Sequence, residues 1–237
     1  MRFFDRALAN GRSIRVRSTD RSDGDFSITA SPFELEDRRR RIVDRPWMWL
    51  QQVHGNRCVV VEADASNDLA GRDRSATAGA QADAAVTTRA DIALCVQTAD
   101  CVPIALWSDD GAIAVIHAGW RGLEAGVIDS GVTALRSCTT APLHALVGPS
   151  IGPECYEFGA VELDRLCERF GISVRSQTSA GRTALDVRIA VRSELTRLSV
   201  AVEMDDDRCT ACDEGFFSHR ARKDAQRQST VIWIEES

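Results

Sequence analysis

Cysteine and histidine side chains stand near the two ends of one short stretch, TADCVPIALWSDDGAIAVIHAGWRG, which runs from Thr98 to Gly122. Its centre, Ser108-Asp109-Asp110-Gly111, places turn-forming residues between two apolar runs, and this pattern predicts a β-hairpin. If Trp107 pairs with Gly111 across the turn, Cys101 lies directly opposite His117. Facing residues have Cβ atoms about 4.5–5.5 Å apart, which suits two ligands of one metal ion.

A third candidate ligand is His54, which ends a predicted strand and precedes Gly55. The chain has only 4 histidines, so few other imidazoles could complete a site with Cys101 and His117. One cysteine and two histidines leave the fourth position of zinc open for water or substrate, which is the pattern of catalytic zinc. We therefore expect Zn²⁺ on His54, Cys101 and His117, where it would lower the pKa of a bound water.

The same residues also support a second interpretation. Cys101 could act as a thiolate nucleophile with His117 as its base, as in cysteine hydrolases. Asp83 or Asp100 would then orient the histidine. In a metal-assisted reaction the same two carboxylates are the candidate proton carriers. The spacing of the residues does not separate the two interpretations.

Candidate substrate contacts lie in three other segments. Arg121 follows Trp120 at the expected start of a helix, where an anion such as phosphate is favoured. Tyr156, the only tyrosine of the chain, lies in the glycine-rich run GPSIGPECYEFG and could stack on a base. His219, in the run FFSHR, is expected near the site because aromatic residues and Arg220 surround it.

The chain has 8 cysteines, and its first residues do not resemble a signal peptide. This combination predicts reduced thiols in the cytoplasm. Cys209 and Cys212 form a single C-x-x-C without a second pair, so we expect ordinary packing in a loop. The remaining thiols in apolar segments are expected to be core residues, namely Cys58, Cys95, Cys138 and Cys167.

Composition excludes several function classes. A net charge of -6 argues against a general nucleic-acid binder. The most apolar stretch, Ile92 to Trp107, is interrupted by Gln97, Thr98 and Asp100, so we expect no membrane span. The oligomeric state is not indicated by the sequence.

Predicted strands arrive in clusters and helices follow them, which favours an α+β fold over a regular βαβ winding. We expect a layered α/β/β/α-type domain with mixed β-sheet, and one domain over residues 1–237 because no internal repeat or linker occurs. The expected helices are residues 31–41, 122–137, 160–171 and 185–198, the expected strands are 47–53, 58–62, 84–88, 92–97, 102–107, 112–117, 144–147 and 230–234, and residues 65–81 form a surface loop.

Six sequence blocks, in this order, resemble the polyphenol oxidase or laccase-domain family, whose bacterial members are also described as purine nucleoside phosphorylases. The resemblance covers residues 49–237, and its combination of motifs is highly specific. The blocks are QQVHG, ADAAVTT, QTADCVPIAL, AVIHAGWRGLEAGV, VGPSIGPECYEFG and FFSHR.

The resemblance implies a zinc site on His54, Cys101 and His117, with Gln52 of the first block among the substrate contacts. It also implies phosphorolysis of adenosine, inosine or methylthioadenosine to the base and ribose 1-phosphate, and an adenosine deaminase activity. The implied partners are thus a nucleoside and phosphate. Alternatives are a copper-dependent polyphenol oxidase, with copper bound in vitro, and a cysteine hydrolase acting on peptidoglycan precursors.

The sequence departs from the family pattern at two places. The amino-terminal segment differs, so the arginine expected to meet phosphate has only Arg17 or Arg21 as nearby candidates. In the GPSIGPECYEFG block, Glu154 replaces one of two adjacent cysteines and leaves Cys155. Substrate capture is therefore less well indicated than metal binding.

Overall fold

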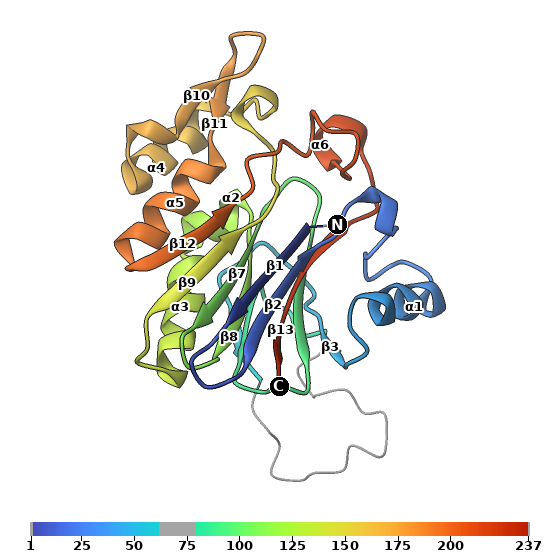
Figure 1. The fold of residues 1–237 in the computed structure, drawn as a ribbon. Helices are drawn as coiled ribbons and strands as arrows, with labels where there is room; N and C mark the ends of the chain where they lie inside the picture. Colours follow the sequence, from blue (N-terminus) through green and yellow to red (C-terminus); the bar gives the residue numbers. More distant parts are fainter. Residues whose placement is uncertain (1, 62–78, 237) are drawn as a thin grey trace.

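Two β-sheets stacked face to face occupy the centre of the protein, and helices cover their outer faces (Figure 1). The computed structural model describes residues 2–61 and 79–236. The predicted surface loop at residues 65–81 lies outside the described residues except for its last three positions.

The first sheet has five strands, which pair antiparallel except that β3 runs parallel to β6. Its two amino-terminal strands were not predicted from the sequence. In the second of them Ile14 and Val16 are buried, whereas Arg15 and Arg17 on the other face are only half-buried, as expected for the two-residue period of a strand. The strand order is β1 (Arg2–Ala7), β2 (Ser13–Ser18), β13 (Gln228–Glu235), β6 (Ala93–Thr98) and β3 (Trp47–Met48).

The second sheet has six strands, antiparallel in its middle and parallel at both edges, where β12 pairs with β9 and β4 with β5. The mixed sheet is therefore confirmed. A short hairpin of β10 (Arg175–Gln177) and β11 (Thr183–Leu185) stands apart from both sheets. The strand order is β12 (Val200–Asp205), β9 (Leu143–Val147), β7 (Val102–Ser108), β8 (Ile113–Ala118), β5 (Ala84–Thr87) and β4 (Cys58–Val60).

Three apolar clusters define the layers. One lies between the sheets and includes Trp107 and Val115 of the second sheet together with Ile232 of the first. Another packs the second sheet against helices on its outer face, and a third packs the first sheet against α1. This is the predicted α/β/β/α layering. The helices are α1 (Pro32–Ile42), α2 (Trp120–Ala125), α3 (Val127–Cys138), α4 (Ala160–Phe170), α5 (Val187–Arg197) and α6 (His219–Arg222), with 3₁₀ turns η1 (Arg21–Asp23), η2 (Pro153–Cys155) and η3 (Ile172–Val174).

The predicted hairpin is β7 and β8, but its register differs from the prediction. Trp107 pairs with Ile113 and Pro103 with His117, so Cys101 does not face His117 directly. The turn begins one residue later than predicted, because the Ser108 hydroxyl accepts the Ala112 N–H at 2.8 Å. A two-residue shift keeps both side chains on the same face of the sheet, so Cys101 and His117 stay diagonal neighbours.

The predicted helix over residues 122–137 is two helices. Its break lies at Gly126, which ends α2 and precedes α3 in the left-handed conformation, with φ 90° and ψ 36°. Glycine adopts this conformation without steric cost. The helices predicted over residues 31–41 and 160–171 are observed as α1 and α4.

Three segments cross from one sheet to the other at one end of the sandwich. They are residues 49–57 after β3, residues 99–101 after β6, and residues 206–227 before β13. The register places them together, because Gln228 pairs with Thr98 and β3 runs alongside β6. The predicted strand 47–53 is therefore short, since its second half leaves the sheet to make this crossing.

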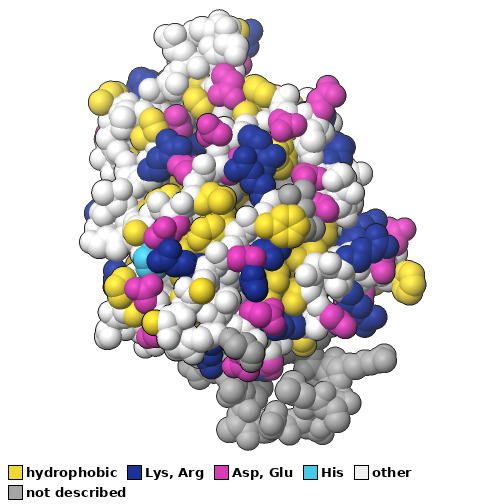
Figure 2. Space-filling model, viewed as in Figure 1, with side chains coloured by type: hydrophobic (Ala, Val, Ile, Leu, Met, Phe, Trp, Pro, Cys, Tyr) yellow, Lys and Arg dark blue, Asp and Glu magenta, His cyan; other side chains and the backbone are white. Residues whose placement is uncertain are grey.

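The face seen in Figure 2 mixes basic and acidic side chains with apolar ones. One ion pair joins the two sheets, because Arg2 of β1 lies 3.3 Å from Asp206, the residue after β12. None of the helices within the described residues combines the length and apolar character needed to cross a bilayer.

Candidate functional site

His54, Cys101 and His117 converge where the chain crosses between the sheets. Their ligand atoms all lie within 4.8 Å of one another. The Cys101 Sγ is 3.8 Å from His54 Nε2, and the two imidazole rings meet edge to face with centroids 4.8 Å apart. His117 lies on the same face of β8 as Ile113 and Val115, so the group sits at the open end of the core between the sheets.

The buried Asp83 holds two of these residues in place. Its carboxylate accepts a hydrogen bond from His117 Nδ1 at 2.8 Å and from the backbone N–H groups of His54 at 2.9 Å and Gly55 at 2.7 Å. These bonds fix the turn in which His54 adopts φ 60°. Burial works against ionisation, but the bonds from His117 and the backbone outweigh it and lower the pKa of Asp83.

Cys101 and His117 each stabilise the charged form of the other. Burial would raise the pKa of the Cys101 thiol, but the His117 and His54 imidazoles outweigh it and lower this pKa to about 6. Burial would lower the pKa of His117, but Cys101 and Asp83 raise it to about 9. Without a metal, the pair is therefore a thiolate and an imidazolium near neutral pH.

The donor set fits a zinc ion. Because His117 Nδ1 is bonded to Asp83, its Nε2 is left as the metal-binding atom, and carboxylate support of this kind is usual for zinc-bound histidine. The two candidate ligands also need glycine at position 119, because a Cβ there would lie 2.8 Å from His54 Cδ2 and 3.1 Å from Cys101 Sγ.

A cavity of about 500 Å³ opens onto this group. Its size is that of a small-molecule site, and its wall mixes polar, aromatic and basic side chains. The lining residues are Ser27, Ile28, Thr29, Leu50, Gln52, His54, Gln97, Thr98, Ala99, Asp100, Cys101, His117, Trp120, Arg121, Tyr156, His219, Arg220, Ala225 and Arg227.

All four predicted substrate contacts line the cavity. Arg121 is exposed and its guanidinium stacks on Trp120, 4.3 Å from the ring centroid. Tyr156 is half-buried, and His219 is exposed on α6. The Gln52 amide is already engaged, since it donates to the Gln97 carbonyl at 2.7 Å and accepts the Gln97 N–H at 2.8 Å.

The two predicted proton carriers occupy different places. Asp83 is not among the cavity-lining residues in the described part of the chain, and its carboxylate instead bonds to His117 and to the His54 turn. Asp100 lines the cavity, and its carboxylate accepts bonds from the Thr210 hydroxyl at 2.8 Å and the Arg220 N–H at 2.6 Å. It therefore fastens the segment that carries α6.

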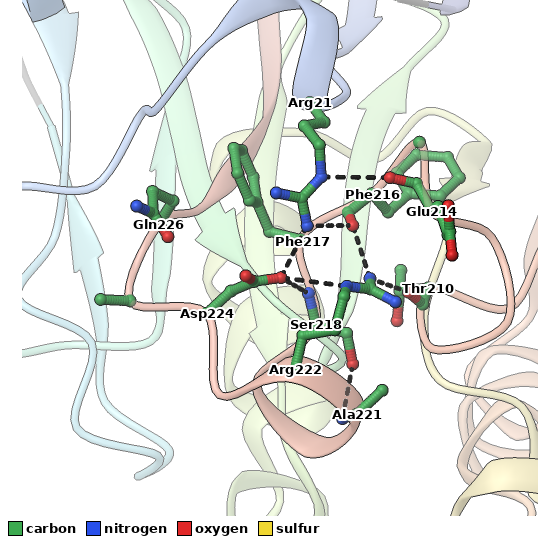
Figure 3. Close-up of polar contacts among 12 residues, drawn as sticks. Arg21, Thr210, Glu214, Phe216, Phe217, Ser218, Ala221, Arg222, Asp224 and Gln226 are labelled. Carbon is green, nitrogen blue, oxygen red and sulfur yellow. Dashed lines mark hydrogen bonds and ion pairs between the residues drawn. The ribbon is translucent and has the colours of Figure 1, made fainter.

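Neither amino-terminal arginine reaches the cavity wall of the described residues. Arg17 bonds to Asp5 at 2.6 Å on the outer side of the first sheet. Arg21 donates to the Glu214 and Phe216 carbonyls at 3.1 Å each and pairs with Asp224 at 2.8 Å (Figure 3).

Two arginines of the wall, Arg220 and Arg227, were missed as candidate contacts. Arg220 donates to the Glu157 carbonyl at 2.8 Å and stacks on Tyr156, 4.8 Å from the ring centroid. Arg220 is the last residue of the FFSHR run, which was a usable signal. Arg227 lies in a charged stretch before the last strand, where the spacing gives no signal.

Cys209 of the C-x-x-C pair is buried in an apolar cluster. A third thiol lies beside the pair, because Cys155 Sγ is 3.1 Å from Cys212 Sγ. Residues 155 and 209 are distant in sequence, so the spacing of cysteines could not reveal the cluster. In contrast, Cys95 is buried within the first sheet as predicted.

Comparisons with known proteins agree with the sequence motifs. A family model described as Multi-copper polyphenol oxidoreductase laccase matches residues 23–235. A purine nucleoside phosphorylase of Xylella fastidiosa (strain 9a5c) is 36% identical over 243 residues, with 96% of this chain and 90% of that protein covered. One of Mycobacterium tuberculosis (strain CDC 1551) is 32% identical over 249 residues, with 94% of each covered.

Solved structures share the fold. YlmD from Geobacillus stearothermophilus superposes with a TM-score of 0.75 at 26% identity, with 97% of this chain and 93% of that chain covered. A Neisseria meningitidis protein gives a TM-score of 0.77 at 23% identity, with 100% of both chains covered. The chain therefore belongs to the multi-copper polyphenol oxidoreductase laccase family.

Proposed function

We propose that this chain is a zinc-dependent purine nucleoside phosphorylase with adenosine deaminase as a second activity. Its substrates would be adenosine, inosine or methylthioadenosine together with phosphate. The similarity to proteins described as purine nucleoside phosphorylases supports the reaction class. The observation that carries the proposal is one cavity that contains the three candidate zinc ligands and the cation of Arg121.

Arg121 is the proposed phosphate contact. Within the described residues its guanidinium forms no ion pair, and its stacking on Trp120 leaves the N–H donors available. The planar donor fork matches phosphate oxygens. A phosphate oxygen would bond to C1′ of the ribose as the bond from C1′ to the base breaks, and the base leaves with a proton on a ring nitrogen. This reaction depends mostly on positioning and charge.

Aromatic side chains offer a place for the base. Tyr156 contacts Phe158 edge to face at 5.4 Å, and Phe158 contacts Trp120 in the same way at 5.3 Å. These contacts limit the movement of the two rings that line the cavity. His219 would donate a hydrogen bond to a ring nitrogen of the base.

His54, Cys101 and His117 would hold the zinc ion, with Asp83 fixing both the His54 turn and the His117 ring. When bound, zinc would act as a Lewis acid and lower the pKa of a bound water. Deamination consumes adenosine and water and releases inosine and ammonia. Phosphorolysis of adenosine instead consumes phosphate and releases adenine and ribose 1-phosphate.

The test is incubation of zinc-loaded protein with adenosine, with and without phosphate, and identification of the products by chromatography. Adenine and ribose 1-phosphate formed only with phosphate support phosphorolysis, and inosine supports deamination. Arg121→Ala should raise the KM for phosphate about tenfold or more, while Arg136→Ala on α3 serves as a surface control. If neither adenine nor inosine forms in either mixture, the proposal is refuted.

A cysteine hydrolase acting on peptidoglycan precursors is a second candidate. The observation that favours it is the chain of contacts from Cys101 through His117 to Asp83, which resembles an activated nucleophile with its base and orienting acid. This candidate predicts hydrolysis that survives chelation and is abolished by alkylation of Cys101. The phosphorylase predicts no such hydrolysis.

Copper oxidation of phenols is a competing use of the same ligands. Copper binds a nitrogen and sulfur site more tightly than zinc, so added copper could create activity in vitro. The 4 histidines of the chain are too few for the several copper centres of a laccase. Metal analysis of protein purified without added copper should find zinc, and copper in its place would favour the oxidase.

A cytoplasmic location forms part of the proposal. All 8 cysteines are free thiols, and Cys101 must stay reduced to act as a ligand. A reducing compartment suits both requirements.

A further inference from the structure

A second cluster of metal-ligating atoms lies beside the cavity. Glu154, Cys155, Cys209 and Cys212 each place one ligand atom within 4.8 Å of the others. The first two belong to η2, and the other two belong to the segment 206–227 that crosses between the sheets. The cluster therefore joins two parts of the chain that are far apart in sequence.

The distances suit a small tetrahedral ion. Cys155 Sγ and Cys212 Sγ are 3.1 Å apart, and Cys212 Sγ is 3.5 Å from Glu154 Oε1. Zinc bonds of about 2.3 Å to sulfur and about 2.1 Å to oxygen put neighbouring ligands of a tetrahedron roughly 3.5–3.8 Å apart. Small side-chain movements would bring the four atoms to that geometry.

The backbone also donates a hydrogen bond to Cys209. Its Sγ accepts the Gly152 N–H at 3.1 Å. Such N–H bonds stabilise the negative sulfur of a metal-bound cysteine. Gly152 has a second role, because a Cβ there would lie 2.3 Å from the Glu154 carboxylate oxygens.

Nearby arginines offset part of the negative charge. Arg188 is buried and donates to the Asp207 and Arg208 carbonyls at 2.6 Å each, directly before Cys209. Arg222 donates to the Thr210 carbonyl at 2.8 Å and to the Ala211 carbonyl at 3.0 Å, within the C-x-x-C loop.

We propose that Glu154, Cys155, Cys209 and Cys212 bind a second zinc ion. Three thiolates and one carboxylate fill the four positions of tetrahedral zinc, which is the closed shell of a structural site. This site is independent of the nucleoside chemistry proposed above. Its soft thiolates select zinc over magnesium or calcium.

This second ion would fasten the wall of the cavity. Tyr156 follows Cys155 directly, and α6 follows the C-x-x-C loop. Further along that segment, Arg21 and Arg222 donate to the Phe216 carbonyl, and Asp224 accepts the Ser218 N–H at the start of α6 (Figure 3). The metal and this network together would fix where His219 and Arg220 stand.

The experiment counts metal ions under reducing conditions in a chain that lacks the first site. Cys101→Ser protein, loaded with zinc and dialysed, should retain one zinc ion per chain in native mass spectrometry. Adding Cys212→Ser should abolish that ion, whereas adding Cys138→Ser on α3 should not. Cys212 is exposed, so its replacement should leave the fold intact, which circular dichroism checks.

Cobalt gives a second readout on the same proteins. Co²⁺ bound to Cys101→Ser protein should show strong sulfur-to-metal charge-transfer absorption, lost on adding Cys155→Ser or Cys212→Ser. Absence of both the retained zinc and this absorption would overturn the proposal. So would a Cys155–Cys212 disulfide in protein isolated without oxidant, seen as a chain lighter by two hydrogen atoms.

Discussion

At the residue scale, Asp83 shows how one buried carboxylate organises a candidate metal centre. It receives the His117 ring on one side and the backbone of the His54 turn on the other. Its sequence context predicted a proton carrier, yet its position behind the candidate ligands favours a positioning role. Its effect on the reaction would therefore pass through the metal.

Asp83→Asn tests that role. The amide keeps the size of the side chain but loses one acceptor and the negative charge, so His117 and the His54 turn lose support. We expect zinc affinity at the first site to fall about 10- to 100-fold, measured by competition with a chromophoric chelator in the Cys212→Ser background. Asp109→Asn, which removes an acceptor of His144 in the hairpin turn, is the matched control. Equal affinities for the two variants would contradict the positioning role.

Gly119→Ala tests the space that the ligands need. The added methyl would press on the His54 ring at 2.8 Å and on Cys101 Sγ at 3.1 Å, and we expect zinc to bind roughly tenfold more weakly, about 1.4 kcal/mol. Calorimetric titration of the metal-free protein provides the measurement. In Gly159→Ala the new Cβ meets only the Glu162 side chain, so that variant should bind zinc normally. A normal affinity for Gly119→Ala would show that the site has more room than the structure gives it.

At the element scale, the break between α2 and α3 depends on Gly126. Any other L-residue there must adopt left-handed backbone at a cost of about 1–2 kcal/mol. Gly126→Ala should therefore lower the free energy of unfolding by about 1 kcal/mol in urea denaturation. Gly126→Asn should lose less, because asparagine tolerates this conformation better. Equal stability of all three proteins would mean that the helices can join without the break.

The elements also show what the sequence could predict. Apolar runs and turn residues predicted β5 to β9 and four helical regions, because a strand covered on both faces reads as a continuous apolar run. The hairpin register was wrong by two residues, since the Ser108 hydroxyl bond to Ala112 decides where the turn closes. Each side chain was still assigned to the correct face of the sheet, because side chains alternate with a period of two residues along a strand.

The candidate site was partly predictable for a related reason. Cys101 and His117 lie on one hairpin, so local spacing brings them together. The cavity wall is different, because Arg220 and Arg227 reach it through the crossing segment 206–227. No local pattern encodes which distant loop will pack beside another, and the roles of Asp83 and Asp100 depended on such packing.

At the scale of the whole molecule, both candidate metal sites lie where the chain passes between the sheets. The three apolar clusters lie mainly between the layers, and one of them extends to the second site, because Cys209 belongs to it and Cys155 packs against it. Strand pairing and the burial of apolar side chains thus stabilise the sandwich, whereas the crossing segments have few strand partners of their own. The site can therefore be arranged by loops on a frame that is already stable.

Removal of metal should consequently loosen one end of the molecule without unfolding it. After chelation under reducing conditions, we expect faster amide hydrogen exchange in residues 49–57, 99–101 and 206–222. Mass spectrometry of peptides measures this exchange. β7, β8 and β13 should keep their protection, because their hydrogen bonds lie inside the sandwich. In the Cys212→Ser variant, zinc should restore protection to 49–57 but not to 206–222, which separates the two sites. Cooperative unfolding of the whole chain on chelation would contradict this, since it would mean that the metals and not the apolar layers hold the fold.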